Sequence, residues 1–231
     1  MSKDVTVIIP VLNEEAALDK LLPALWKLQN GNVKETLVVD GGSSDTSRQV
    51  ARKHQARVLS APKKGRAIQM NFGAKNAGTD ILYFLHADTT PPPDFDSAII
   101  GQIHKGADAG CFRLRFDDAH PALKFYAWFT RFSSTLLRFG DQSLFVKKEL
   151  FEKIGGFDES LIVMEDQKIV RECKKHGRFD LLPEPVVTSA RKYRKNGVLR
   201  LQFIFTLIWS LYYLGVKQNT LAHLYRILVK F

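Results

Sequence analysis

The sequence predicts an α/β fold in which a mostly parallel sheet carries helices on both faces. Short runs of β-branched and apolar residues alternate, along the first half of the chain, with segments whose apolar residues recur at helical spacing. A strand followed by a helix and another strand forms a parallel pair, because the helix returns the chain to the starting edge. The chain has 231 residues, of which 45% are hydrophobic and 25% charged, so one such domain can bury a substantial core.

Local signals predict each element of the first half. Gly41-Gly42 stops the second strand, and Asp45 suits the first turn of the helix that follows. The fourth strand is entirely apolar, which predicts a central place in the sheet. The expected strands are Val5–Val11, Glu35–Asp40, Arg57–Ala61 and Ile81–Leu85, and the expected helices are Ala16–Leu28, Ser43 or Ser44 to about His54, and Gly65–Ala77.

The second half is less regular and contains an aromatic-rich stretch. Pro121–Phe139 interleaves its aromatic side chains with Lys124, Arg131 and Arg138. The remaining expected strands are Ala109–Phe116, Ser143–Val146 and an extended Pro183–Ser189, and the remaining expected helices are Asp94–His104, Lys148–Ile154, Glu165–Lys175, Val198–Val216 and a last one from about Thr220.

The net charge of +10 predicts an acidic partner, and its distribution narrows the choice. Residues 1–184 hold 26 basic and 24 acidic side chains, whereas the eight basic residues beyond Glu184 have no acidic counterpart. The excess charge is therefore a property of the C-terminal end. We accordingly divide the chain into a main domain, residues 1–190, and a basic, apolar helical segment, residues 191–231.

The cysteines and the N-terminus predict a reducing compartment. Cys111 and Cys173 cannot form a disulfide framework, and no Cys-x-x-Cys pair suggests a zinc site. The first strand begins without a basic region or a cleavage site of the kind that marks a secretory signal. We therefore expect a cytoplasmic protein.

Polar residues follow three of the predicted strands, at the edge where open parallel sheets bind ligands. They are Asn13-Glu14, Asp40–Asp45 and His86-Ala87-Asp88. Acidic groups gathered at one edge repel each other unless a cation, such as a divalent metal ion, neutralises them. Gly41-Gly42 would let backbone N–H groups approach a ligand closely, and Lys63, Lys64 and Arg66 at the same edge suit phosphate oxygens. The pattern indicates a pocket for a nucleotide and a metal ion.

Each of these motifs alone also has a purely structural interpretation. Asp40–Ser43 could be a tight turn with a helix cap, Asp88 a turn residue, and Lys63-Lys64 a solvated loop. Their joint occurrence at successive strand ends favours the ligand site. The dinucleotide fingerprint G-x-G-x-x-G and the P-loop G-x-x-x-x-G-K-[ST] are both absent, which argues against NAD-dependent enzymes and ATPases.

Seven motifs then carry a family resemblance. They are Val7–Glu15, Val39–Thr46, Gly65–Ala74, Leu85–Thr89, Gly140–Gln142, Gly155–Phe157 and Met164–Asp166. In this order they resemble the motifs of family 2 glycosyltransferases with the GT-A fold, and the similarity extends to about residue 225. The most similar subgroup is the bacterial set described as radical-SAM/selenodomain-associated transferases.

The resemblance implies an inverting transfer of a sugar from a nucleoside-diphosphate sugar to a hydroxyl acceptor. Asp166 would be the catalytic base, oriented by Glu165. Asp88, with His86, would hold Mn²⁺ or Mg²⁺ against the diphosphate, where the ion acts as a Lewis acid. The residues implied in binding the nucleotide sugar are Pro10, Asn13, Glu14, Asp40, Gly41, Ser43, Arg66 and Ala87.

Two positions depart from the family pattern. His86 stands where the D-x-D motif has its first acid, which implies a metal ion held by fewer protein ligands. The Q-x-x-R-W motif is reduced to Ala190–Arg194, so processive polymer synthesis is not expected. Without the family context, Glu165-Asp166 would be interpreted as an acidic first turn of a helix, and His86 as a hydrogen-bonded residue at a strand end.

Val198–Val216 is the most hydrophobic segment of the chain. Its uninterrupted part, Phe203–Val216, has 14 residues, fewer than the roughly 20 needed to cross a bilayer. On a helix, Gln202, Thr206 and Ser210 form a narrow polar stripe beside a wide apolar face. That face packs on the main domain, forms a homodimer interface, or lies on the anionic inner face of the plasma membrane. The membrane alternative would suit a lipid-linked acceptor, and the aromatic-basic stretch Phe125–Arg138 would then share this surface or cover the acceptor.

Two other classes of function stay open. One is a nucleotide-sugar-binding protein with little or no turnover, in which His86 marks a degenerate metal site. The other is a basic membrane- or nucleic-acid-binding module, which the net charge alone suggests. Because such a module leaves the polar strand ends unexplained, we do not expect nucleic acid as a partner.

Overall fold

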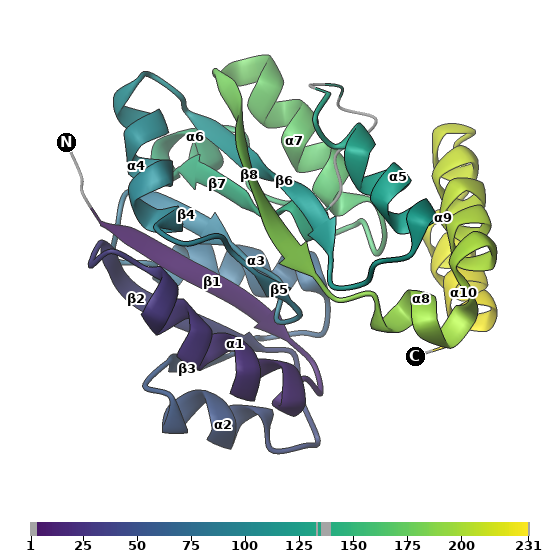
Figure 1. The fold of residues 1–231 in the computed structure, drawn as a ribbon, viewed down its shortest axis with the longest axis horizontal. Coiled ribbons are helices and arrows are strands. Elements are labelled where there is room, and N and C mark those ends of the chain that lie inside the picture. The colour runs from purple at the N-terminus through teal and green to yellow at the C-terminus, as the bar shows by residue number, and fades with distance from the viewer. Residues whose placement is uncertain (1–3, 133, 135–139, 231) are drawn as a thin grey trace.

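The computed structural model describes residues 4–132, 134 and 140–230, which form one eight-stranded sheet with helices on both faces (Figure 1). The strands are β1 (Val5–Val11), β2 (Val33–Asp40), β3 (Arg57–Ser60), β4 (Ile81–Phe84), β5 (Thr89–Thr90), β6 (Ala109–Phe116), β7 (Leu144–Lys147) and β8 (Phe179–Thr188). The helices are α1 (Glu15–Leu28), α2 (Ser47–Lys53), α3 (Arg66–Asn76), α4 (Phe95–His104), α5 (Pro121–Phe129), α6 (Lys148–Lys153), α7 (Glu165–His176), α8 (Arg191–Asn196), α9 (Val198–Tyr213) and α10 (Gln218–Leu228), with a 3₁₀ turn, η2, at Gly140–Gln142.

The sheet has the order β3-β2-β1-β4-β7-β6-β8-β5 and is mostly parallel. The first four strands in this order all run in the same direction, with β4 next to β1 as its apolar sequence predicts. β7 pairs antiparallel with both β4 and β6, and β6 pairs in parallel with β8. The predicted α/β architecture is therefore confirmed.

β1 lies at the centre of the core because its side chains alternate between the two faces of the sheet. Val5, Val7 and Ile9 pack with side chains of α1 and α4, whereas Ile8 packs on the opposite face with side chains of α3 and α7. All four are fully buried. Each such side chain removed from water stabilises the fold by about 1.5–3 kcal/mol.

Helix α3 approaches the sheet closely because it has a glycine at the contact. A Cβ atom at Gly73 would lie 2.4 Å from Cγ2 of Ile8 and 3.1 Å from Cγ2 of Val39. Any larger residue would push α3 away from β1 and β2. The glycine therefore fixes the distance between the helix that begins with Arg66 and the strand ends that flank it.

Three details differ from the sequence-based expectation. The helix expected from Ser43 or Ser44 begins only at Ser47, because the Asp45 carboxylate accepts hydrogen bonds from the Ser47 N–H (3.0 Å) and hydroxyl (2.5 Å) and holds a turn there. β8 begins four residues before Pro183, and a register shift at Phe112/Arg113 accommodates its prolines. The third difference is that the short strand β5 and the short helix α8 were not predicted.

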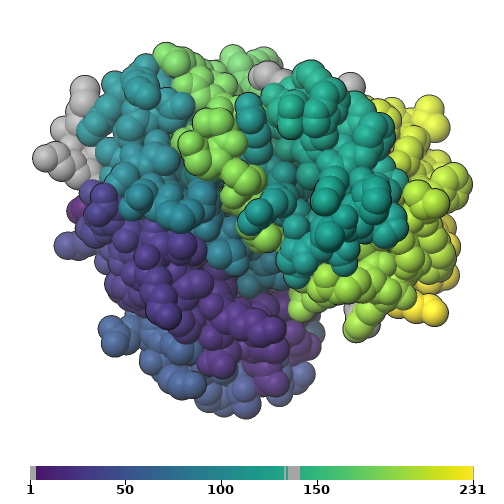
Figure 2. Space-filling model, viewed as in Figure 1, coloured from purple at the N-terminus to yellow at the C-terminus, as the bar shows by residue number. Residues whose placement is uncertain are grey.

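The C-terminal helices form a second layer beside the sheet. Side chains of α9, among them Leu201, Ile204 and Ile208, pack in one cluster with Leu123 of α5 and Tyr193 of α8. Figure 1 shows α9 and α10 side by side at the right-hand edge of the molecule, across from α4, and Figure 2 shows the same edge as an outer surface. Among the described residues, no helix has the length and apolar character needed to span a membrane.

Candidate active site

The ends of β1 and β2 are joined by hydrogen bonds between the polar residues that follow them. The Asn13 N–H donates to the Ser43 hydroxyl (2.9 Å), and the Ser44 N–H donates to the Asn13 side-chain oxygen (2.8 Å). Asn13 has a positive φ of 56°, a conformation that asparagine tolerates better than most residues. Two of the predicted strand-end motifs thus form one connected loop structure.

The Asp40 carboxylate shapes this loop from within. It is buried and accepts hydrogen bonds from the backbone N–H groups of Gly42 (3.2 Å) and Ser43 (3.0 Å). Gly42 has a φ of +95°, which glycine adopts without strain. In this structure the side chain therefore orients the backbone of the Gly41–Ser43 loop, while the resemblance implied contact with the base or ribose.

Arg66 forms ion pairs with both predicted catalytic acids. Its Nε donates to Glu165, and its Nη2 donates to Oδ2 of Asp166 at 2.7 Å. Glu165 is 1% exposed, and its second carboxylate oxygen is buried without a hydrogen-bond partner in the structure. The residue that the resemblance placed near the nucleotide therefore neutralises the acidic pair at the start of α7.

The surroundings of Asp166 raise its pKa. Burial is the largest cause, the nearby Glu165 charge adds to it, and the Arg66 guanidinium opposes it, which leaves the pKa of Asp166 at about 6. A carboxylate with a pKa near neutrality can accept a proton during a reaction and release it afterwards. This property matches the role of a general base.

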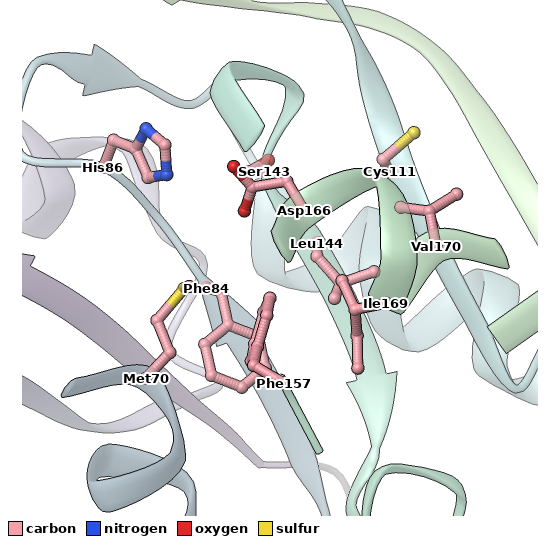
Figure 3. Close-up of a pocket in the computed structure, with 10 residues that line it drawn as sticks. All are labelled: Met70, Phe84, His86, Cys111, Ser143, Leu144, Phe157, Asp166, Ile169 and Val170. Atoms are coloured by element: carbon pink, nitrogen blue, oxygen red, sulfur yellow. The ribbon is translucent and has the colours of Figure 1, made fainter. Parts of the chain in front are cut away.

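A small cavity lies beside Asp166. The cavity, about 20 Å³ in volume, is lined by Met70, Phe84, His86, Cys111, Ser143, Leu144, Phe157, Asp166, Ile169 and Val170. Figure 3 shows His86 and Asp166 at one end of it and the side chains of Met70, Phe84 and Phe157 below them. Because most of the lining is apolar, it favours the neutral form of the carboxyl group.

His86 is paired with an acid that the sequence-based site did not include. Nδ1 of His86 lies 3.3 Å from Oδ1 of Asp141, in the 3₁₀ turn η2. Burial opposes protonation of His86, but the hydrogen bond to Asp141 and the charges of Asp166 and Asp141 raise its pKa above the ordinary value. Burial likewise disfavours the Asp141 carboxylate, yet His86 and the nearby cations hold the pKa of Asp141 at about 2. The only sequence signal for Asp141 was its place in the Gly140–Gln142 motif.

A second missed residue, Arg191, links Asp88 to Glu14. Nη2 of Arg191 donates to Glu14 and lies 3.5 Å from Oδ2 of Asp88. The backbone supports this arrangement, because the Ser189 N–H donates to the Asp88 carbonyl (3.0 Å) and β5 pairs with β8. Burial raises the pKa of Asp88, and the Asp141 charge adds to this effect. Arg191 was visible in the sequence only as part of Ala190–Arg194.

The predicted residues thus fall into two adjoining groups. The first, at the ends of β1 and β2, contains Pro10, Asn13, Glu14, Asp40, Gly41 and Ser43; the second contains Arg66, His86, Ala87, Asp88, Glu165 and Asp166. Arg191 joins the groups through its contacts with Glu14 and Asp88. Within the second group, Asp141 attracts His86 and Arg66 and repels Asp88 and Asp166, so the charges of these five residues act on one another.

The donor atoms of this site suit a divalent cation that is shared with a substrate. Within the described part of the chain, no cluster of three or more His, Cys, Asp or Glu side chains is arranged as a metal site. Mg²⁺, however, is commonly held by one or two carboxylates together with substrate phosphates, and carboxylate and imidazole groups also suit Mn²⁺. Asp88, with His86 and its partner Asp141, offers such a partial ligand set. The residues therefore fit the implied ion as joint ligands with a diphosphate.

The polar loops at the strand ends, the buried acidic pair and the partial ligand set lie at the edge where open α/β sheets bind ligands, and they suit a ligand that carries phosphate. Residues 6–157 match the family described as glycosyl transferase family 2. Because this match covers well over half of the 231 residues, the chain belongs to that family.

Two curated relatives from Mycobacterium tuberculosis match part of the chain. An uncharacterised glycosyltransferase is 33% identical over 111 residues, covering 48% of this chain and 49% of its own length. Glucosyl-3-phosphoglycerate synthase is 30% identical over 115 residues, covering 45% of this chain and 35% of its own. The chain therefore aligns with half or less of the length of these relatives.

Solved structures share the fold at low sequence identity. The mannosyltransferase PcManGT from Pyrobaculum calidifontis, in complex with GDP-Man and Mn²⁺, has a TM-score of 0.69 at 19% identity, covering 89% of this chain and 62% of that one. The glucosyl-3-phosphoglycerate synthase of Mycobacterium tuberculosis, with Mn²⁺, UDP and glucosyl-3-phosphoglycerate, has a TM-score of 0.58 at 19% identity, covering 80% and 70%. These similarities confirm the GT-A fold.

Proposed function

We propose that the protein is an inverting glycosyltransferase that moves a sugar from a nucleoside-diphosphate sugar to a hydroxyl acceptor. The observation that carries the proposal is the placement of Asp166, a buried carboxylate with a pKa near 6, in one electrostatically linked group with Asp88. Family membership supports it, as do the GDP-Man bound in one structural relative and the UDP bound in another. Membership of the radical-SAM/selenodomain-associated subgroup stays a prediction.

In this mechanism Asp166 takes the proton of the acceptor hydroxyl. The acceptor oxygen forms a bond to the anomeric carbon as the bond from that carbon to the diphosphate breaks, so the configuration inverts. Arg66 holds Asp166 in place through its 2.7 Å ion pair, and Glu165 fixes Arg66 from the other side. The Arg66 pair also keeps part of the Asp166 population ionised against the effect of burial.

The donor would lie across the ends of β1 and β2. Pro10, Asn13, Glu14, Gly41 and Ser43 would contact the nucleoside, with Asp40 holding their loop in shape. A bound Mn²⁺ or Mg²⁺ would neutralise the charge of the leaving diphosphate as a Lewis acid. Asp88 would hold the ion, and His86 would contribute directly or through its pairing with Asp141.

The donor is tested by thermal unfolding with UDP-, GDP-, CMP- and dTDP-linked sugars, each with and without Mn²⁺. We expect one nucleotide class to raise the melting temperature, more strongly with Mn²⁺, because a ligand stabilises the state that binds it. If no nucleotide raises it under any condition, the proposal fails. The anomeric configuration of the product, measured by NMR, tests the inverting course separately.

A nucleotide-sugar-binding protein with little turnover is the second candidate. It is favoured by the contacts of the two expected metal ligands in this structure, since His86 pairs with Asp141 and Asp88 lies beside Arg191. Transfer or hydrolysis of the donor that is lost in both Asp88→Ala and Asp166→Ala would decide for the enzyme. Nucleotide binding without measurable turnover, unchanged in Asp166→Ala, would decide for the binding protein.

A further inference from the structure

The outer side of the C-terminal helical hairpin carries large apolar side chains in water. Leu199 is 70% exposed and Phe203 68% on α9, Leu214, the C-cap directly after α9, is 79% exposed, and Ile227 is 65% exposed on α10. The first three are 4 and 11 positions apart, which places them on one side of the helix and its cap at 100° per residue. Arg200 donates to the Leu228 carbonyl (2.9 Å) and so brings the Ile227 end of α10 beside the start of α9. We call these four residues the C-terminal apolar face.

The polar residues on the same side of α9 are compatible with an apolar surrounding. The Thr206 hydroxyl donates to the Gln202 carbonyl and the Ser210 hydroxyl donates to the Thr206 carbonyl, both at 2.9 Å. Hydroxyl groups that bond to the carbonyl four residues earlier need no water to satisfy them. The stripe that the sequence presents as polar therefore does not require exposure to water.

Basic residues lie close in sequence to the members of this face. Arg226 and Lys230 flank Ile227 and Lys217 follows Leu214; all three are exposed, and no acidic residue occurs after Glu184. Among the described residues, the salt bridges of the segment from residue 191 onward include those of Arg191 and Arg194, whereas Arg226, Lys230 and Lys217 take part in none. The charges around the face thus remain available to an anionic partner.

We propose that the C-terminal apolar face docks this enzyme onto the surface of an anionic lipid bilayer. An exposed apolar stripe with flanking cations is typical of interfacial helices, whose apolar side enters the headgroup boundary while the basic residues contact lipid phosphates. The hairpin would meet the bilayer at the edge of the molecule that lies across from α4 (Figure 1). The inference goes beyond the proposed reaction and does not depend on the donor nucleotide, although a lipid-linked acceptor would be presented at the same surface.

Co-sedimentation with vesicles tests the docking. We compare vesicles of phosphatidylcholine alone with vesicles that contain 30% phosphatidylglycerol (roughly the anionic content at which surface charge attracts basic segments). We expect binding to the anionic vesicles that weakens with salt, and little binding to the neutral ones. Each charge removed by Arg226→Gln or Lys230→Gln should weaken binding about fivefold.

Variants of the C-terminal apolar face distinguish docking on lipid from contact with a second copy of the chain. Phe203→Ser with Leu214→Ser should weaken vesicle binding at least about tenfold, whereas Trp26→Ser, which removes a half-exposed tryptophan from α1, should not. Thermal unfolding of each variant checks that it folds. Absence of binding to anionic vesicles, or an equal loss in the Trp26 variant, overturns the proposal. A dimer without lipid that Phe203→Ser with Leu214→Ser converts to a monomer, measured by light scattering, also overturns it and assigns the face to a second copy of the chain. Because these measurements need no nucleotide, their failure is separable from failure of the proposed reaction.

Discussion

The raised pKa of Asp166 predicts that the candidate base destabilises the folded protein. The carboxyl group titrates near 3.8 when solvated and at about 6 in the folded state, so above pH 6 folding carries the cost of an unfavourable buried charge. From the free energy of about 1.4 kcal/mol for each tenfold change in proton affinity, this cost is about 2–3 kcal/mol at pH 8. Asp166→Asn keeps the shape and an acceptor for Arg66 but removes the ionisation. It should therefore unfold with a free energy about 1–3 kcal/mol higher than the parent at pH 8, while transfer activity is lost.

The sign of the pH dependence follows from the direction of the shift. As pH falls through 6, the folded parent takes up a proton at Asp166 before the unfolded chain does, so the parent recovers stability. The advantage of the Asn variant should shrink between pH 6 and 4 and vanish below about pH 4. Urea unfolding of both proteins at steps of pH from 8 to 4 measures the difference in unfolding free energy. At pH 8, each kcal/mol of this difference corresponds to a rise in melting temperature of roughly 2–4 °C.

Asp158→Asn is the matched control, since the same substitution should have the opposite effect. Hydrogen bonds from Lys168 and Ser160 hold the pKa of Asp158 at about 2, so its ionised form stabilises the fold. This variant should be less stable than the parent at pH 8, and the deficit should disappear only as pH falls below about 4. Either of two results would refute the idea that burial destabilises the charge of Asp166. One is that Asp166→Asn is no more stable than the parent at pH 8, and the other is that its advantage does not depend on pH.

Three further predictions test the site and its support. Arg66→Gln removes the cation that lowers the pKa of Asp166, so the acid limb of the pH profile of kcat/KM should move to higher pH. If the acid limb does not move, Arg66 does not set the pKa of the base. Gly110→Ala should destabilise the protein by about 3 kcal/mol in urea unfolding, because the new Cβ atom would lie 2.3 Å from the Asp180 carbonyl oxygen. Gly101→Ala is the control: its Cβ atom would meet no atom within 4 Å, so this variant should be neutral or slightly stabilising. Gln69→Leu should lower the free energy of unfolding by about 1–3 kcal/mol, because the buried Gln69 amide donates to the carbonyls at the ends of β1 and β2 (2.8 and 2.7 Å). The same variant should weaken nucleotide binding, and an unchanged thermal shift with nucleotide would contradict this expectation.

The fold was predictable because its signals are local. The fully apolar Ile81–Phe84 became a central strand, and the β-branched run Val5–Val11 became the strand that packs helices on both faces. The short strand β5 and the helix α8 were not predictable in this way. β5 has two residues and exists only through its pairing with Thr188 and Val187, a contact of high sequence separation.

The site was predictable as a set of strand-end residues, but its internal pairing was not. Spacing and family resemblance placed His86, Asp88 and Asp166 at one edge. Neither could show that Arg66 binds Asp166 across 100 positions of sequence. Nor could they show that Asp141 would reach His86, because that contact depends on how the antiparallel strand β7 enters the sheet after η2.

Arg191 connects the C-terminal segment to the candidate active site, although the composition of this segment presents it as an appendage. The Ala190 N–H donates to the Asp117 carboxylate (2.6 Å), which anchors α8 at the end of β6, and Arg191 then reaches Glu14 and Asp88. The same segment continues into α9, whose outer side belongs to the C-terminal apolar face. A displacement of the hairpin at a bilayer surface would therefore act on Arg191 through one helix of six residues. The charge excess beyond Glu184 is thus divided: Arg191 balances carboxylates of the candidate site, Arg194 pairs with Asp117 and Asp118, and Arg226, Lys230 and Lys217 accompany the face that we assign to lipid.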